Sequence, residues 1–161
     1  LRPDFLLRSR IFTPNQIRES NRVVFIRNPY ARVVSLYNHK RRFGYEGSFS
    51  GFLDGVQRSW QGGSKSDRKL RMMSRPMSYW VLAPKWPGWT HVFRTEDMDA
   101  AVLKLQGILD LNSTPTPLDF WPDYPSAVVG SSEKKRIEEM YIEDFENFTY
   151  ARTVPEKYWS G

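Results

Sequence analysis

The sequence predicts an α/β protein in which a parallel sheet is flanked by helices. Residues 23–26 are a short apolar run that fits a strand buried on both faces, and residues 91–94 predict a second short strand. Segments with apolar residues at helical spacing lie between and after these runs, separated by loops rich in proline and glycine. Strands that alternate with helices are typical of a parallel sheet, because each crossover connection carries a helix over one face.

The composition predicts one domain over residues 1–161 and limits its chemistry. Hydrophobic residues make up 40% of the chain, and 24 Lys and Arg against 18 Asp and Glu give a net charge of +6. A basic protein suggests an anionic partner, such as a nucleotide, an acidic sugar, nucleic acid or a membrane surface. The sequence has no cysteine and two histidines, so we expect no metal site. No apolar run is long enough for a membrane span.

The helices are predicted, in chain order, from capping residues and apolar periodicity. Thr13-Pro14 is an N-cap followed by a first-turn proline, and it predicts a short helix. Asn28-Pro29 has the same form and predicts a helix to about Arg42, directly after the first strand. Further helices are expected over Phe52–Trp60, within residues 77–83, after a Thr95 cap, and from about Ser132 to Phe148.

Two strands make a small sheet for a chain of this length. A parallel pair alone buries little apolar surface, so we expect that part of the sheet lies outside residues 1–161. The chain also begins at Leu1 rather than at a methionine, which suggests trimming at the N-terminus. The sequence is therefore interpreted as one domain that is truncated at its N-terminal side.

The turn between the first strand and its helix is a candidate anion site. Arg27 lies at the carboxyl end of the strand, where open α/β sheets bind their ligands. The helix N-terminus that follows offers N–H groups and a partial positive charge, which suit a phosphate. The Arg27 guanidinium and the Ser35 hydroxyl would add hydrogen bonds to the same anion. The alternative is an ordinary surface arginine and serine on an amphipathic helix.

Three segments of the chain resemble motifs of sulfotransferases that use 3′-phosphoadenosine 5′-phosphosulfate (PAPS). RNPYARVVSLY, residues 27–37, matches every fixed position of the 3′-phosphate motif R-x-P-x-x-R-x-x-S-x-Y. RPMSYW, followed by HVFRTEDMDAAVLKL, resembles two further family segments. YIEDFENFTY, residues 141–150, resembles the carboxy-terminal signature Y-x-x-D-F-x-x-F-x-Y of the carbohydrate branch, which includes Golgi-type and bacterial family 2-like enzymes.

The resemblance implies a P-loop-NTPase-like fold and transfer of a sulfuryl group from PAPS to a hydroxyl of a carbohydrate. It implies that Arg27 and Ser35 bind the 3′-phosphate of the donor. It also implies that Arg32 binds the same phosphate or the neighbouring loop, and a structural salt bridge is the alternative for Arg32. The expected partners are PAPS, its product 3′,5′-adenosine bisphosphate (PAP), and a carbohydrate or other hydroxyl acceptor, which can itself be anionic.

The sequence departs from the family at a second motif. In the family, a strand followed by a Lys-x-Gly-x-[Ser/Thr] loop holds the 5′-phosphosulfate, and nothing before Asn21 matches it. We therefore expect this strand and loop to lie outside the sequence, and residues 1–161 alone to transfer sulfate slowly or not at all. GGSKS, residues 62–66, resembles a phosphate loop but lacks a preceding strand, so Lys65 is expected in a surface loop.

No motif identifies the catalytic residue, and His39 and Glu96 are the candidates. His39 lies on the polar face of its helix, one turn after Ser35, and Glu96 follows the second strand. The alternatives are a structural or substrate-facing role for His39 and a favourable interaction of Glu96 with the helix dipole. Four tryptophans between residues 60 and 89 would suit sugar stacking, although core positions are the commoner use.

Two other functions compete with sulfuryl transfer. One is a non-catalytic nucleotide- or anion-binding protein on the same fold. The other is a basic nucleic-acid-binding module, which would interleave basic and exposed aromatic residues on one surface. The basic residues are spread along the chain, so this module ranks last and no nucleic-acid partner is expected. The lack of cysteine favours a cytoplasmic protein of bacterial or viral type over one in the Golgi lumen.

Overall fold

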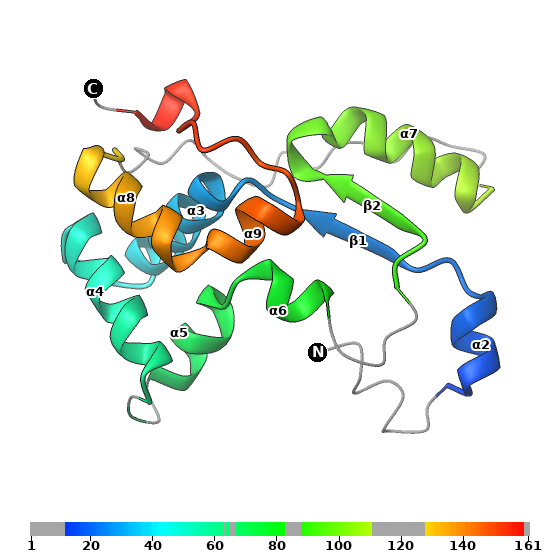
Figure 1. Cartoon of the computed structure of the whole chain (residues 1–161), viewed down its shortest axis with the longest axis horizontal. Coiled ribbons are helices and arrows are strands. Elements are labelled where there is room, and N and C mark those ends of the chain that lie inside the picture. The colour runs from blue at the N-terminus through cyan, green and yellow to red at the C-terminus, as the bar shows by residue number, and fades with distance from the viewer. Residues whose placement is uncertain (1–11, 63, 65–66, 83–87, 111–127, 160–161) are drawn as a thin grey trace. The chain divides into compact units, whose positions relative to one another are not determined.

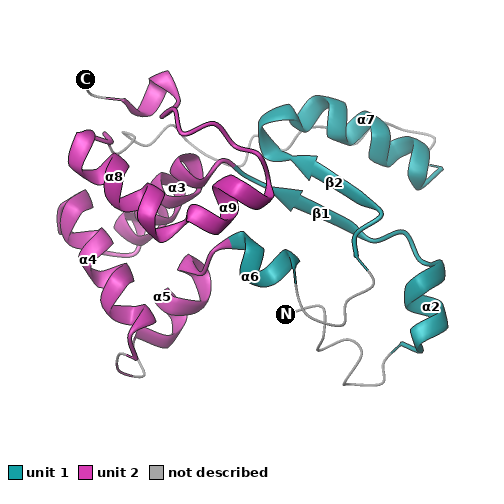
Figure 2. Cartoon of the chain, viewed as in Figure 1, with its two compact units in different colours: residues 1–27, 77–120 teal, residues 28–76, 121–161 magenta. Residues whose placement is uncertain are grey.

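The computed structural model describes residues 12–62, 64, 67–82, 88–110 and 128–159. The chain divides into two compact units (Figures 1 and 2). Unit 1 comprises residues 1–27 and 77–120, and unit 2 comprises residues 28–76 and 121–161. Helices and a parallel strand pair occur together, so the predicted α/β class is confirmed. Among the described helices, none has both the length and the apolar composition that crossing a bilayer requires.

Unit 1 contains both predicted strands, but the burial predicted for residues 23–26 is wrong, because only Ile26 of this strand is buried and Phe25 is exposed. The strands are β1 (Val23–Ile26) and β2 (His91–Arg94), which pair in parallel with Val23 opposite His91. Helix α7 (Met98–Ile108) packs against β2 in Figure 1. The predicted Thr95 cap is wrong, because a 3₁₀ turn, η1 (Thr95–Asp97), separates the strand from α7. The two other helices among the described residues of this unit are α2 (Pro14–Glu19) and α6 (Met77–Val81).

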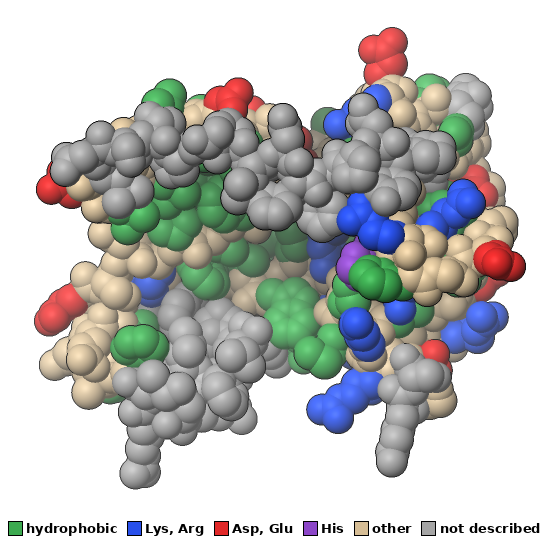
Figure 3. All heavy atoms as spheres, turned by 180° about the vertical axis from the view of Figure 1, so that it is seen from behind, with side chains coloured by type: hydrophobic (Ala, Val, Ile, Leu, Met, Phe, Trp, Pro, Cys, Tyr) green, Lys and Arg blue, Asp and Glu red, His purple; other side chains and the backbone are tan. Residues whose placement is uncertain are grey.

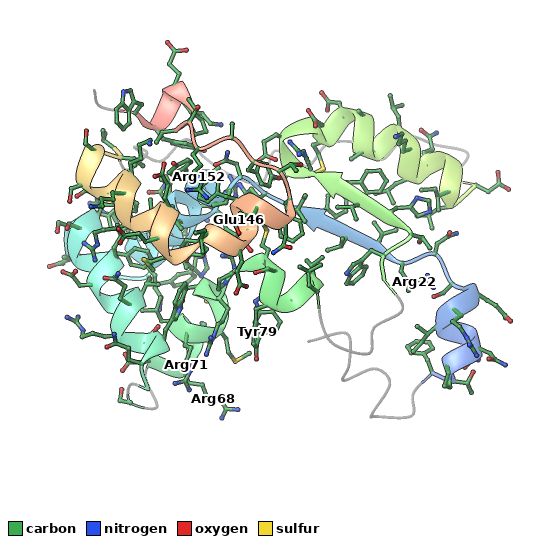
Figure 4. The ribbon with its side chains drawn as sticks, in the orientation of Figure 1. Arg22, Arg68, Arg71, Tyr79, Glu146 and Arg152 are labelled. Carbon is green, nitrogen blue, oxygen red and sulfur yellow. The ribbon has the colours of Figure 1, made fainter. Side chains whose placement is uncertain are left out.

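Arg22 connects α2 to the strand pair within unit 1 (Figure 4). Its guanidinium donates to the carbonyls of Ile17, Arg18 and Ser20 at the end of α2. Its Nε donates to the carbonyl of Gly88, just before β2, at 2.7 Å. The last carbonyls of a helix have no partner within the helix and carry its negative dipole end, so an arginine stabilises them. This side chain therefore fixes the start of β1.

Unit 2 is helical in its described residues, and two of its boundaries differ from the prediction. Helix α4 begins at Phe49 rather than Phe52, because Ser48 is the N-cap and accepts from the N–H of Gly51 at 3.1 Å. The single helix predicted to end at Phe148 is two helices that meet at Tyr141, where φ is −118° and ψ is 25°. The helices are α3 (Pro29–Arg42), α4 (Phe49–Trp60), α5 (Asp67–Ser74), α8 (Ser131–Met140) and α9 (Ile142–Asn147), followed by the 3₁₀ turn η2 (Glu156–Tyr158).

The core of unit 2 lies where α3 meets α4, α8 and α9. Four side chains at helical spacing form a buried apolar stripe along α3. Each fully buried side chain of this size contributes about 1.5–3 kcal/mol relative to an exposed one. At one end of the stripe, the ring of Tyr30 meets Phe145 of α9 edge-on at 5.2 Å. The stripe consists of Tyr30, Val33, Val34 and Tyr37.

A polar contact also joins α3 to α8. The buried hydroxyl of Tyr30 donates to Glu138 Oε1 at 2.6 Å, and Lys134 Nζ lies 2.7 Å from the same oxygen. Burial raises the pKa of Tyr30, and the bond to Glu138 adds to this increase. Burial alone would raise the pKa of Glu138, but the hydrogen bonds from Lys134 and Tyr30 lower that pKa below its ordinary value of 4.5.

The lowered pKa of Glu138 predicts a contribution to stability that acid removes. The contribution is fully present above the unfolded value of 4.5 and is lost as the pH falls through the lower folded pKa. Glu138→Gln should therefore be less stable than the wild type at pH 7, with a difference that shrinks towards pH 3. Urea unfolding across this range measures it, with the exposed Glu139→Gln as control. A difference that does not change with pH would contradict the prediction.

Candidate functional site

The sequence predicts that the N-terminus of α3 presents free N–H groups to an anion. In the structure, the helix's own cap residue, Asn28, accepts hydrogen bonds from these groups. Asn28 Oδ1 accepts from the N–H of Tyr30 at 3.0 Å and of Ala31 at 3.4 Å. The N–H of Arg32 donates to the Asn28 carbonyl at 2.9 Å, and Pro29 has no N–H. The first four positions of the helix therefore leave no free donor. An anion here would depend on side chains and on the helix dipole.

The polar side-chain groups of Arg27 and Ser35 form no hydrogen bond or ion pair within the described residues. Arg27 follows β1 directly, and its backbone N–H donates to Met77 Sδ at 3.3 Å, within unit 1. Both residues are half-buried, and within the described residues neither the Arg27 guanidinium nor the Ser35 hydroxyl has a hydrogen-bond or ion-pair partner. Arg27 ends unit 1 and Ser35 belongs to unit 2, so their joint contact with one phosphate stays a prediction from the motif.

The guanidinium of Arg32 forms hydrogen bonds within unit 2. Its Nη2 donates to the carbonyl of Met73 at 3.0 Å and of Arg75 at 2.7 Å, at the end of α5. Its guanidinium carbon lies 5.9 Å from the centre of the Tyr141 ring. Arg32 therefore holds the end of α5, and its contact with the loop beside the phosphate stays a prediction. Nη1 is buried without a partner in the described residues, and binding of phosphate by Arg32 stays a prediction.

Tyr141, the first residue of the carboxy-terminal signature, binds the same end of α5. Its fully buried hydroxyl donates to the carbonyl of Ser74 at 2.8 Å. Burial raises the pKa of Tyr141, so the hydroxyl stays protonated and can donate at neutral pH. Arg32 and Tyr141 thus satisfy the carbonyls of residues 73–75, a set of contacts that we call the α5 clamp. Because the clamp ends at Arg75, it fixes the start of the segment RPMSYW.

The remaining fixed positions of the first motif also serve the fold. Pro29 is buried at the first position of α3. The Tyr37 hydroxyl donates to the carbonyl of Gly47 at 3.0 Å, and its ring packs edge-on against Phe49 at 5.2 Å. Of the five motif residues, Arg27 and Ser35 are therefore the two whose polar side chains make no hydrogen bond or ion pair at all in the described part of the chain, whereas Arg32 leaves only its Nη1 unpaired there.

The two catalytic candidates have separate surroundings. His39 is half-buried in α3, and its ring meets Phe43 edge-on at 4.8 Å. Glu96 is exposed in η1 of unit 1. These positions do not select one of them as the base, and both roles stay predictions. Lys65, the candidate for a phosphate loop, lies outside the described residues.

Two of the described tryptophans near the middle of the chain, Trp60 and Trp89, hydrogen-bond within their own units. Trp60 Nε1 donates to Ser74 Oγ at 2.9 Å, and its ring meets Tyr141 edge-on at 5.5 Å. Trp89 Nε1 donates to the carbonyl of Val81 at 2.8 Å. These contacts favour the structural alternative for Trp60 and Trp89 over sugar stacking. Trp86 lies outside the described residues.

Comparison with known proteins agrees with the three motif segments. The model of the sulfotransferase family matches residues 5–151, which contain all three segments and parts of both units. No curated protein and no solved structure matches the chain. The family match covers most of the 161 residues and includes the α5 clamp as well as Arg27 and Ser35. The chain belongs to the sulfotransferase family, whose members are enzymes.

Proposed function

We propose that this sulfotransferase takes its sulfuryl group from PAPS and transfers it to a hydroxyl of a carbohydrate. Arg27 and Ser35 bind the 3′-phosphate of the donor. The observation that carries the proposal is that the residues of the first motif differ in whether their side chains already have partners within the fold. Pro29, Arg32 and Tyr37 have contacts in the fold, whereas Arg27 and Ser35 keep uncommitted polar groups. A phosphate accepts hydrogen bonds from both of these groups.

The 3′-phosphate does not react, but its binding positions the donor. During transfer, the acceptor oxygen forms a bond to sulfur and the bond between sulfur and the 5′-phosphate oxygen breaks, which releases PAP. The acceptor proton passes to a base, for which His39 and Glu96 are the candidates. Binding energy at the far end of the donor holds the sulfur in line with the acceptor, which lowers the entropic part of the barrier. The net charge of +6 favours association with this anionic donor.

The proposal is tested by comparing PAP with 5′-AMP, which lacks the 3′-phosphate. We expect calorimetry to show that the wild type binds PAP about 10- to 100-fold more tightly, since hydrogen bonds to charged groups contribute about 1.5–3 kcal/mol. Arg27→Ala should remove most of this preference, and Ser35→Ala should remove a smaller part. Arg68→Ala removes the same charge from an arginine of α5 that points outwards in Figure 4, and it should keep the preference.

Two outcomes decide between the competing functions. Equal affinity of the wild type for PAP and 5′-AMP would contradict the 3′-phosphate site. Transfer of radiolabelled sulfate from PAPS to any member of a glycan panel would support the carbohydrate acceptor, and acceptors without sugar serve as controls. A lack of transfer by residues 1–161 alone is expected under either function, because they contain no recognisable 5′-phosphosulfate loop, so only transfer that is observed decides between the two functions.

A further inference from the structure

Unit 2 has a pocket of about 150 Å³ beside α4. Its apolar lining comes from Phe52 and two glycines of α4, from Leu70 of α5 and from the ring of Tyr45. Phe52 is buried, while Tyr45 and Leu70 are half-buried, so the pocket opens to solvent beside the core. A cavity of this volume accommodates about one benzene ring.

Gly55 has no side chain to fill the pocket. The surrounding atoms would nevertheless tolerate a Cβ atom at this position. A Cβ built at Gly55 would meet Leu70 Cδ2 at 3.8 Å, which is an ordinary van der Waals contact, and its φ is not positive. A glycine inside a helix costs about 1 kcal/mol relative to alanine. The fold would therefore be more stable with alanine at this position. Glycine at this position adds no side chain to the volume of the pocket.

Two cations line the same pocket. Lys40 comes from the last turn of α3 and Arg58 from the last turn of α4. Within the described residues, neither has a hydrogen-bond or ion-pair partner. The nearby carboxylate of Asp54 is paired with Arg136 at 2.6 Å, so it does not neutralise them. Figure 3 shows lysine and arginine side chains gathered over unit 2 on the face that it presents. The pocket thus combines an apolar interior with uncompensated positive charge.

We propose that this pocket binds an aromatic ring that carries an anionic group. The ring contacts Phe52 and Leu70, and the anion pairs with Lys40 and Arg58. A sugar ring fits less well, because its hydroxyls need several partners. Besides the two cations, Tyr45 provides the only side-chain hydroxyl of the described lining. Burial raises the pKa of Tyr45, so this hydroxyl stays protonated and can donate to the anion at neutral pH.

The pocket is separate from the proposed 3′-phosphate site. Lys40 follows Ser35 by five residues on α3. Five residues correspond to a rotation of about 140° around a helix, so the two side chains project from different faces. The inference therefore stands independently of the proposed function. It assigns to the chain a second anion site that differs from the first in its apolar interior.

The experiment uses benzenesulfonate, its neutral isostere benzenesulfonamide and the sugar anion glucuronate as probes. Ligand-observed NMR titration should detect benzenesulfonate most strongly, with at least about tenfold weaker binding of the other two. Lys40→Gln combined with Arg58→Gln should abolish the preference for sulfonate over sulfonamide. PAP should not displace benzenesulfonate. Equal binding of sulfonate and sulfonamide by the wild type, or displacement by PAP, would overturn the proposal.

Filling the pocket provides a second test that does not change charge. Gly55→Leu adds a side chain into the open volume and should weaken benzenesulfonate binding by about tenfold or more. Gly107→Leu is the matched control, because a Cβ at Gly107 of α7 meets nothing within 4 Å. Circular dichroism confirms that both variants are folded. Unchanged binding in the folded Gly55→Leu variant would show that the ring does not occupy this pocket.

Discussion

Tyr141→Ala should lower the free energy of unfolding by about 3–5 kcal/mol, the usual cost of removing a buried aromatic side chain. The Tyr141 ring is fully buried and packs against Trp60, while its hydroxyl binds the Ser74 carbonyl. Alanine would leave a cavity in unit 2 and an unsatisfied carbonyl at the end of α5. Urea unfolding followed by circular dichroism and tryptophan fluorescence measures the loss.

Tyr141→Phe separates the hydrogen bond from the packing. The ring is kept, but the Ser74 carbonyl loses its donor at a buried position, so we expect a loss of about 1–3 kcal/mol. Tyr45→Phe is the matched control. Among the described residues, the hydrogen bond of the Tyr45 hydroxyl is a long one of 3.5 Å to the Ser48 carbonyl, and its removal should change stability little. If Tyr141→Phe is as stable as the wild type, the hydrogen bond from Tyr141 to Ser74 does not stabilise unit 2.

The elements that the sequence predicts well have signals within a few residues of their ends. Asn28-Pro29 predicts the start of α3 because both the cap and the proline act on the first turn. The start of α4 also has a local signal, the N-cap Ser48, which accepts a hydrogen bond from the N–H of Gly51 three residues later. A cap residue just before the predicted helix therefore indicates the earlier start. The break at Tyr141 is different. Its hydroxyl binds a carbonyl 67 positions earlier in the chain, and no local pattern contains that contact.

The motif predicts which residues belong to the site, but it does not separate their roles. Arg27 and Arg32 are the same residue type, five positions apart, and a phosphate would accept hydrogen bonds from either. The structure distinguishes them through their surroundings: Arg32 binds two carbonyls of its own unit, whereas Arg27 has no such partner in the described residues. Similarly, the pocket beside Gly55 depends on Leu70 of another helix, so sequence alone does not indicate it.

Arg32→Ala should therefore affect stability more than ligand binding. Removal of the guanidinium leaves the Met73 and Arg75 carbonyls without their donor, and each unsatisfied buried acceptor costs about 1–3 kcal/mol. We expect a total loss of about 2–4 kcal/mol, and a smaller loss for Arg32→Lys, whose ammonium keeps the charge but lacks the planar fork. Urea unfolding measures both values, with Arg68→Ala as the control for removing an exposed arginine.

Nucleotide binding by the same variants decides between the two roles of Arg32. Arg32→Lys, measured at a temperature where it is folded, should still prefer PAP to 5′-AMP, because its contacts hold the end of α5 rather than the ligand. Arg27→Ala should show the opposite pattern, with near wild-type stability and a lost preference. The contrast depends on changing two arginines, five positions apart in the sequence, that have different partners. Wild-type stability together with a lost PAP preference in Arg32→Lys would instead place Arg32, through its unpaired Nη1, on the phosphate.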